Sequence, residues 1–291
     1  MYEFEYAAPS SVDDAVLILA ENGDDARILA GGTDIIAQLK ENRRRLKVLV
    51  DVKKIPEVNE LSYDAGSGLH VGAAVPCYKT YEDEAIHSAY PCLTDATSLI
   101  GSIQIQSRAT VAGNLCNSSP AADAIPALIA LGATTKIAGP NGTRDVVAED
   151  FCTGPGQNVL QNGEFVVSIS IPPPEANSGG FSLRFIPRNE MDIAVANAAA
   201  YVVLSDDHKS FVSARLSVGA VAPTPLLLTE VNDLLAGEEV SDEIIEEAAG
   251  IARNAANPIT DMRGTKEQRI HLAGVLSRRA INGAIERAKG S

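Results

Sequence analysis

Residues 29–34, with the sequence LAGGTD, carry the clearest indication of the fold of this chain. An expected strand over 26–30 leads into the two glycines, a helical pattern over 35–42 follows, and a second expected strand covers 46–52. This order of strand, paired glycines, helix and strand is typical of a βαβ unit. Glycines in such a turn let the backbone come close to a ligand, and the first N–H groups of the helix then point at it. The stretch therefore predicts a place where phosphate could bind.

Two interpretations of this turn stay open on the residues alone. One is a phosphate site, and the other is a tight turn between strand and helix that holds no ligand. No GxGxxG pattern follows the strand, which argues against an ordinary dinucleotide-binding fold. Asp34 would repel a phosphate, so we expect its carboxylate to serve the helix start or to bond backbone amides.

A second segment with similar chemistry is RATVAGNLCNSSPAAD, residues 108–123. Backbone amides around Gly113, the Thr110 hydroxyl and the Asn114 amide could surround a second phosphate or a ribityl chain. Asp123, in the first turn of the next expected helix, could accept hydrogen bonds from ligand hydroxyls. The competing interpretation is a segment that only caps and turns a helix. The two segments lie about eighty residues apart, so a ligand that touches both needs a pyrophosphate and a long polar arm.

The clearest break in the chain is PPPEANSGG, residues 172–180. Beyond it strands precede helices, which favours an α+β arrangement. We expect an N-terminal subdomain over 1–60, a second over 61–175 and a C-terminal domain over 176–291. The other expected elements are strands over 68–74, 134–138, 165–171, 181–186, 194–204 and 211–220, and helices from Ser10 or Ser11 to Gly23 and over 89–100, 121–131, 226–235, 242–254 and 266–288.

The overall charge restricts the class of partner. The chain has 291 residues, a formal net charge of -14 and a pI near 4.7, which argue against binding nucleic acid or an anionic membrane. An acidic surface suits a basic protein partner. No apolar run approaches the roughly 20 residues that span a bilayer, and the first residues lack the basic start of a signal peptide, so we expect a cytoplasmic protein without a membrane span.

Cysteine and histidine offer no evident metal site. No cysteine pair has CxxC spacing and none lies near a histidine, so we expect reduced, mostly buried thiols. The four cysteines are Cys77, Cys92, Cys116 and Cys152. The four histidines, which lie outside both segments and for which we expect surface or packing roles, are His70, His87, His208 and His271. The basic run 43–45 is expected to be a solvated helix end, with a partner contact as the alternative.

Taken in order, LAGGTD and TVAGNLCNSSPAAD (110–123) resemble the paired FAD-binding segments of the molybdenum hydroxylase flavoproteins. These are the FAD-binding, or medium, subunits of enzymes such as xanthine dehydrogenase and carbon monoxide dehydrogenase. The resemblance continues at 188–194, 261–265 and 276–280. It implies an α+β chain: an FAD-binding fold of the p-cresol methylhydroxylase and vanillyl-alcohol oxidase type, with two α/β subdomains, and a C-terminal α+β domain of antiparallel sheet and helices.

The resemblance also implies which residues hold FAD, bound non-covalently because neither segment has a histidine for a covalent link. The implied cofactor-binding residues are Ala30, Gly31, Gly32, Thr33, Asp34, Thr110, Gly113, Asn114, Asp123 and Arg184. Asp123 is expected at the ribityl chain and Arg184 near the phosphates or adenine. Two departures bear on FAD affinity: Ala112 stands where the family more often has a first glycine, and Gln106-Ser107 where Arg-Asn is common. An extra methyl at Ala112 is tolerable only if its φ is negative.

The function implied by the resemblance is electron transfer. FAD on this subunit would take electrons from iron–sulfur clusters of a small partner subunit and pass them to an external acceptor. The small subunit would receive them from the molybdopterin cofactor of a large subunit, in a dimer of heterotrimers. Molybdenum and iron–sulfur groups are expected only on those partners, and no residue of this chain is expected to act on the organic substrate. Two alternatives are a free-standing FAD oxidase of the same fold and a scaffold subunit whose flavin site has decayed.

Overall fold

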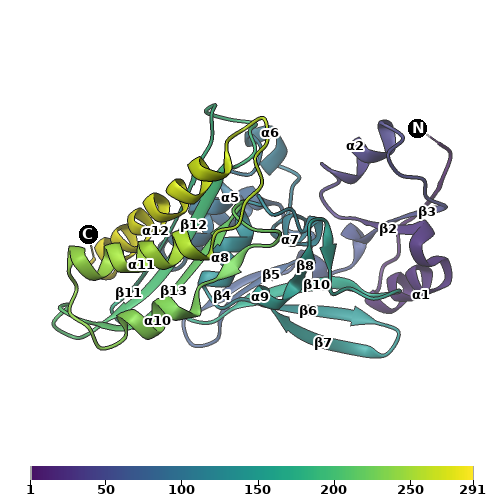
Figure 1. The fold of residues 1–291 in the computed structure, drawn as a ribbon. Coiled ribbons are helices and arrows are strands. Elements are labelled where there is room, and N and C mark those ends of the chain that lie inside the picture. Colours follow the sequence, from purple (N-terminus) through teal and green to yellow (C-terminus); the bar gives the residue numbers. More distant parts are fainter. Residues whose placement is uncertain (1, 291) are drawn as a thin grey trace.

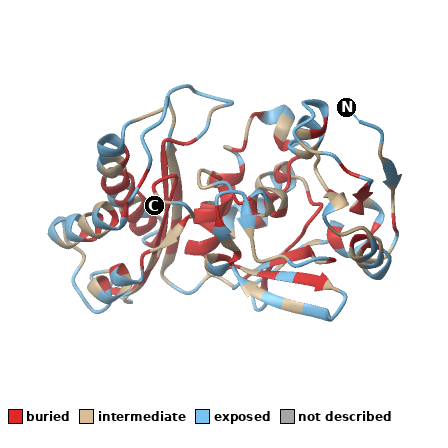
Figure 2. Ribbon diagram, turned by 45° about the vertical axis from the view of Figure 1, so that its right-hand side comes forward, coloured by how far each residue is buried: buried red, intermediate tan, exposed pale blue. Residues whose placement is uncertain are grey.

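The computed structural model describes residues 2–290. Three larger sheets follow one another along an extended molecule, with the N-terminal sheet at one end and the C-terminal helices at the other (Figure 1). A small pair of strands, β8 (Cys152–Gly154) and β9 (Gln157–Asn158), lies between them. The outer faces of the C-terminal helices are exposed, while the strands beneath them are buried (Figure 2).

The first sheet has the strand order β1-β3-β2, and all of its strands run parallel. Its strands are β1 (Glu5–Ala7), β2 (Ala26–Leu29) and β3 (Val48–Asp51), and its helices are α1 (Val12–Asn22) and α2 (Ile35–Lys40). The expected βαβ unit is confirmed. The Ser11 side chain caps α1 by accepting from the Asp14 N–H, and Gly23, with φ of 53°, ends it. The sequence did not predict β1, because three half-exposed residues carry almost no periodic signal.

The second sheet is antiparallel and has five strands. In spatial order they are β4 (Leu61–Asp64), β5 (Gly68–Gly72), β10 (Phe165–Ile171), β6 (Thr134–Gly139) and β7 (Gly142–Val147). The three inner strands were predicted from their apolar runs. The edge strands β4 and β7 were not, because each has only one neighbour and carries polar residues on its exposed side.

The middle of the chain also contains short helices, some of which contact the strands of this second sheet. They are α3 (Cys77–Glu82), α4 (Glu84–Ala89), α5 (Pro91–Thr97), α6 (Ile103–Gln106), α7 (Val111–Asn117), α8 (Ala124–Ala130) and α9 (Ala148–Phe151). Every residue of α8 is buried, so this helix forms the centre of the core. The prediction of one helix over 89–100 was too long, since the helix begins at Pro91 and ends at Thr97. The stretch 101–120, for which the sequence predicted no element, contains the two short helices α6 and α7.

The C-terminal region is an antiparallel sheet covered by helices, as predicted. Its strands, in spatial order, are β11 (Ser178–Phe185), β12 (Ala196–Leu204), β13 (Phe211–Gly219) and β14 (Leu226–Leu227), and its helices are α10 (Thr229–Leu235), α11 (Asp242–Ala255) and α12 (Lys266–Ala288). The longest helix, α12, lies directly on β11 and β12 (Figure 1). A Cβ at Gly179 would come within 2.2 Å of the Ala284 carbonyl oxygen, so glycine permits this close packing.

Two half-buried arginines join the C-terminal region to the helices α5 and α9. Arg287 of α12 forms a bidentate ion pair with Asp95 of α5: Nη1 donates to Oδ2 at 2.6 Å and Nη2 donates to Oδ1 at 3.0 Å. Arg287 Nη1 also donates to the Gly180 carbonyl oxygen. Arg215 of β13 donates to Glu149 at 3.0 Å. Bidentate, charge-assisted hydrogen bonds are directional, so the pair of Arg287 with Asp95 fixes the orientation of the C-terminal region relative to α5 as well as the distance between them.

Candidate functional site

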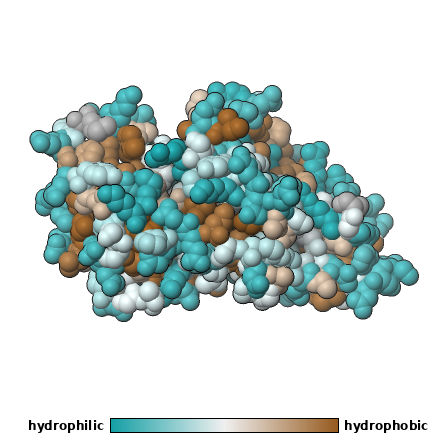
Figure 3. All heavy atoms as spheres, turned by 180° about the vertical axis from the view of Figure 1, so that it is seen from behind, coloured by the Kyte–Doolittle hydropathy of each residue, from teal (hydrophilic) through white to brown (hydrophobic). Residues whose placement is uncertain are grey.

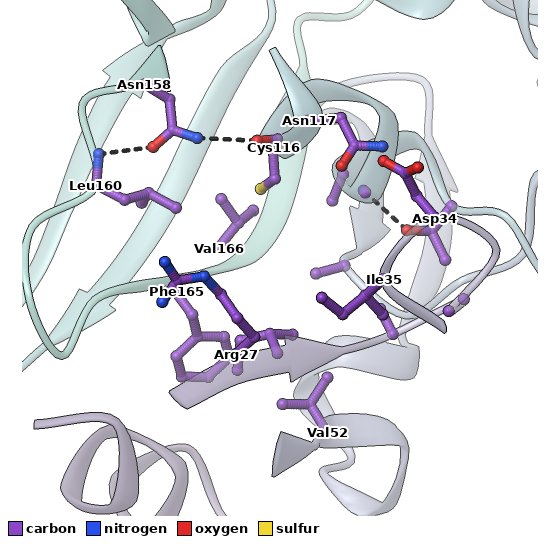
Figure 4. Close-up of a pocket in the computed structure, with 18 of the residues that line it drawn as sticks. Arg27, Asp34, Ile35, Val52, Cys116, Asn117, Asn158, Leu160, Phe165 and Val166 are labelled. Atoms are coloured by element: carbon purple, nitrogen blue, oxygen red, sulfur yellow. Dashed lines mark hydrogen bonds between the residues drawn. The ribbon is translucent and has the colours of Figure 1, made fainter. Parts of the chain in front are cut away.

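A cleft of about 790 Å³ lies between the first sheet and the α7–β10 region. One wall comes from the end of β2 and the start of α2, and the other from α7 and from the segment 156–166 (Figure 4). In the space-filling view from behind, a hollow sets the N-terminal part off from the rest of the surface (Figure 3). A volume of this size is in the range of sites for large organic ligands.

The two sequence segments meet at this cleft. Eight of the ten predicted residues line it: Ala30, Gly31, Gly32, Thr33, Asp34, Thr110, Gly113 and Asn114. Asp123 and Arg184 are outside this lining. The competing interpretation, in which each segment is only a local turn, does not explain why segments so far apart in the sequence face one another.

The first wall is shaped by the paired glycines. A Cβ on Gly31 would stand 2.2 Å from the carbonyl oxygen of Arg108, which belongs to the other wall. Gly32 has φ of +81°, a conformation that L side chains rarely adopt. Gly31 therefore allows the two walls to touch, and Gly32 allows the chain to turn there into α2.

The second wall is a capped helix start. The Thr110 hydroxyl accepts a hydrogen bond from the Gly113 N–H at 2.9 Å, which makes Thr110 the N-cap of α7. Asn114 Oδ1 accepts from the Ala124 N–H at 3.1 Å and ties α7 to α8. Ala112 lies inside α7, is buried, and is not among the residues with positive φ. Its methyl group therefore causes no backbone strain.

Asp34 stands at the N-cap position of α2, but its side chain makes no capping bond. Instead Oδ2 accepts from Gln38 Nε2 at 3.4 Å. Of the two expected roles, Asp34 does stand at the helix start, but the expected bonds from its carboxylate to backbone amides are not found among the described residues. The reason is geometric: Asp34 has φ of -105° and ψ of -51°, in the helical region, whereas a capping side chain needs an extended backbone.

Two arginines of the cleft were missed by the sequence analysis. Arg27 on β2 and Arg44 both line it, and Arg44 Nε donates to Gln38 Oε1 at 3.2 Å. Burial, together with the nearby positive charge of Arg44, lowers the pKa of Arg27. Two guanidinium groups placed close together in a cleft favour an anionic ligand, because a phosphate would relieve their repulsion. The sequence offered one indication of this position for Arg27: side chains alternate along a strand, so Arg27 points to the opposite face of β2 from its two neighbours.

The segment 156–166 was also missed. Asn158 Nδ2 donates to the Cys116 carbonyl at 2.9 Å, and Asn158 Oδ1 accepts from the Leu160 N–H at 3.1 Å, so this segment is fastened to α7 (Figure 4). Leu160 and Val166 then add apolar surface to the cleft. The run GPGQN at 154–158 signals a turn, but its position beside α7 depends on tertiary contacts.

Asp123 and Arg184 form a buried ion pair with each other. Arg184 Nη1 lies 2.8 Å from Asp123 Oδ1, and their side chains are 5% and 14% exposed. Burial raises the pKa of Asp123 to about 6 and outweighs the lowering effect of Arg184. Arg184 Nε and the neighbouring Asn197 Oδ1 are buried without hydrogen-bond partners. Buried polar atoms without partners cost free energy, so these two atoms could still bind a polar group. The cluster lies next to the cleft, because Asp123 precedes Ala124, whose N–H donates to Asn114.

Groups that could react with a flavin are few. Cys116 lines the cleft, and burial, followed by the nearby Cys152, raises the pKa of its thiol to about 12. The thiol is therefore protonated at neutral pH and a poor nucleophile. No histidine lines the cleft, and within residues 2–290 no three metal-binding side chains cluster together. In the same part of the chain, no helix combines the length and the hydropathy needed to cross a membrane.

The cleft has the chemistry of a site for a large dinucleotide. Backbone amides of two segments and two guanidinium groups suit a pyrophosphate, while Val52, Ile100, Leu160 and Val166 suit aromatic rings. FAD fits this set of donors and apolar surfaces. The fold and the site together define the class of the protein: one with a cleft, between its first and second sheets, that suits a flavin dinucleotide.

Comparison with known proteins identifies the family. Residues 2–174 match the FAD binding domain in molybdopterin dehydrogenase, and residues 181–284 match the CO dehydrogenase flavoprotein C-terminal domain. The xanthine dehydrogenase FAD-binding subunit of Escherichia coli O157:H7 is 30% identical over 100% of this chain and 99% of its own. The carbon monoxide dehydrogenase medium chain of Afipia carboxidovorans is 33% identical over 98% of each chain.

Solved structures agree with these matches. Carbon monoxide dehydrogenase from Hydrogenophaga pseudoflava superposes with a TM-score of 0.93 at 29% identity, over 98% of both chains. Quinoline 2-oxidoreductase from Pseudomonas putida 86 superposes with a TM-score of 0.90 at 30% identity, over 99% of this chain and 98% of that chain. This chain belongs to the family of FAD-binding subunits of the xanthine dehydrogenase and carbon monoxide dehydrogenase medium-chain type. It is an oxidoreductase component whose cofactor is FAD.

Proposed function

We propose that FAD lies in the cleft with its pyrophosphate between the 31–34 loop and the start of α7. The observation that carries this is the meeting of the two walls, since Gly31 touches the backbone of Arg108 just before Thr110. Backbone N–H groups there, together with Arg27 and Arg44, supply the donors that two phosphates need. The binding is non-covalent, because the cleft offers no histidine and its one thiol is protonated.

We propose further that Asp123 faces the ribityl chain of the same ligand, as the resemblance implies; because Arg184 is paired with Asp123 at 2.8 Å, we place Arg184 beside the ribityl chain as well, and not near the phosphates or adenine as the resemblance implied. Both residues lie outside the cleft lining, but Ala124 connects Asp123 directly to Asn114, which does line it. The unpartnered Arg184 Nε supports this placement, because a ligand oxygen would satisfy it. Bound FAD supplies the chemistry of collecting and passing on two electrons, while these residues bind and orient it.

The assembly is proposed on the names of the relatives, which are subunits and medium chains. In this proposal the chain docks an iron–sulfur small subunit and a molybdopterin large subunit, in a cytoplasmic dimer of heterotrimers. The acidic charge of -14 suits a basic partner surface. We also propose the domain division 1–60, 61–175 and 176–291, which is supported by the presence of one of the three larger sheets in each part.

The test compares the isolated chain with its native complex. The complex is purified through a tag on this chain, its iron, molybdenum and flavin are measured, and a substrate that it oxidises is identified. We expect that substrate to reduce the flavin of the complex rapidly and to leave the FAD of the isolated, FAD-loaded chain oxidised. Rapid flavin reduction in the isolated chain would contradict the subunit role and favour a free-standing oxidase. An isolated chain that takes up no FAD would favour a scaffold.

A further inference from the structure

A buried carboxylate stands at the carboxyl end of the first sheet, just outside the cleft. Asp51, the last residue of β3, is 7% exposed. Its Oδ2 accepts from the Tyr6 hydroxyl at 2.5 Å, and its Oδ1 lies 2.7 Å from Lys53 Nζ and accepts from the Lys53 N–H at 3.0 Å. Burial opposes ionisation of this carboxyl, but the bonds from Lys53 and Tyr6 outweigh it and lower its pKa. Asp51 is thus a fixed anion that holds the Lys53 ammonium group.

The second contact of that ammonium group reaches the wall of the cleft. Lys53 Nζ donates to the carbonyl oxygen of Ala30 at 3.2 Å. Ala30 and Gly31 line the cleft, whereas Lys53 does not. In a trans peptide the C=O and the following N–H point in opposite directions, and the described chain has no cis peptide. By holding the Ala30 carbonyl, Lys53 therefore fixes the direction of the Gly31 N–H.

We propose that Lys53 is a positioning residue for FAD: it orients the Ala30–Gly31 peptide at the phosphate loop, and Asp51 and Tyr6 hold Lys53 in place. The inference rests on the proposed FAD site. Lys53 acts through the loop and not on the ligand, since Asp51 neutralises its charge at 2.7 Å. Loss of Lys53 should therefore weaken FAD binding without changing its dependence on salt, whereas loss of a direct phosphate contact would reduce that dependence.

The experiment uses the full chain and measures the Kd for FAD by quenching of flavin fluorescence at several salt concentrations. Lys53→Met is expected to bind FAD about tenfold more weakly, the effect of losing one hydrogen bond from a charged group, with an unchanged salt dependence. Lys53→Arg, which keeps a charged donor, should recover most of the affinity. The matched control is Lys54→Met, an exposed neighbour outside the cleft lining, which should bind within about twofold of the unaltered chain.

Hydrogen exchange in the flavin-free protein separates positioning from general destabilisation. Lys53→Met should speed exchange at 31–33 and leave the amides of β2 and β3 unchanged. If Lys53→Met binds FAD as tightly as Lys54→Met does, the proposal is overturned. It is also overturned if Lys53→Arg remains folded but does not recover the affinity for FAD.

If Lys53→Met does not fold, Tyr6→Phe is the variant that tests the proposal, because this change removes only a hydroxyl from a largely exposed residue. Its expected loss is about threefold, and an unchanged Kd would overturn the proposal. Failure of the unaltered chain to bind FAD would instead refute the proposed site.

Discussion

The two walls of the cleft use glycine for different purposes. On the first wall, Gly31 is needed because the Arg108 carbonyl oxygen occupies the place of a side chain, only 2.2 Å from its Cβ position. On the second wall, Gly113 sits in the first turn of α7, where the nearest atom to a Cβ would be the Thr110 hydroxyl oxygen at 2.9 Å. The first wall depends on close backbone contact and the second on a capped helix, so the second can tolerate substitutions that the first cannot.

The largest effect is expected for Gly31→Ala. The new methyl group would overlap the Arg108 backbone, so the two walls must separate, which typically costs about 1–3 kcal/mol of stability. We expect FAD affinity to fall by roughly a hundredfold, because both walls hold the ligand. The matched control is Gly250→Ala in α11, where no atom lies closer than 3.8 Å to the new Cβ and glycine is a poor helix former. Equal FAD affinity in the two variants, measured by fluorescence titration, would refute the contact between the walls.

A pH effect is expected where the second wall joins the C-terminal sheet. The pKa of Asp123 is about 6 in the folded chain, above the ordinary value, so folding favours its protonated form. Its contribution to stability is complete at low pH and is lost as pH rises from about 4 to 6, by up to roughly 1.4 kcal/mol per pH unit. Urea unfolding of the flavin-free chain should show that its free energy of unfolding declines over this pH range relative to that of Asp123→Asn. Above pH 7 the difference between the two free energies should no longer change with pH. A difference that instead grows with pH would mean that Arg184 outweighs burial.

A smaller effect should follow from removing the cap of the second wall. Thr110→Ala deletes the acceptor for the Gly113 N–H and should lower the free energy of unfolding by about 1 kcal/mol. Thr110→Ser keeps the oxygen and serves as the control. Both values come from chemical denaturation. If Thr110→Ser lowers the free energy of unfolding by the same amount, the buried methyl group of Thr110 contributes more to stability than the cap does.

The smallest effect is expected for Ala112→Gly, which introduces the glycine that the family resemblance led us to expect at this position. Because Ala112 is helical and buried, glycine there should destabilise the chain by about 0.5–1 kcal/mol. FAD affinity should stay within about twofold, since no strain is relieved. A marked gain in affinity, measured in the same titration, would show that the alanine methyl group does obstruct the ligand.

The sequence predicted those parts of the molecule whose signal is local. The βαβ unit around Gly31 and Gly32 follows from strand patterns and turn residues over a short stretch, and the C-terminal strands follow from long apolar runs. The edge strands β4 and β7 and the helices α6 and α7 were missed because short, half-exposed elements have weak periodicity.

The site was only partly predictable, for a different reason. Eight predicted residues reached the cleft because their chemistry is concentrated in two segments. Arg27, Arg44 and the segment 156–166 reach it through tertiary contacts. Strand alternation at Arg27 and turn residues at 154–158 indicate local structure, but they do not show that a ligand binds there. The pairing of Asp123 with Arg184 joins residues 61 positions apart in the sequence. Their contact with FAD remains a prediction.

The most direct test of the account is hydrogen exchange of the full chain with and without FAD, at a ligand concentration that gives saturation. We expect one FAD per chain and slower exchange on both walls together, at 31–34 and at 110–114, with no change in the distant helix α11. Protection of one wall alone, or of neither in a chain that has bound FAD, would contradict the claim that the two segments hold one ligand between them.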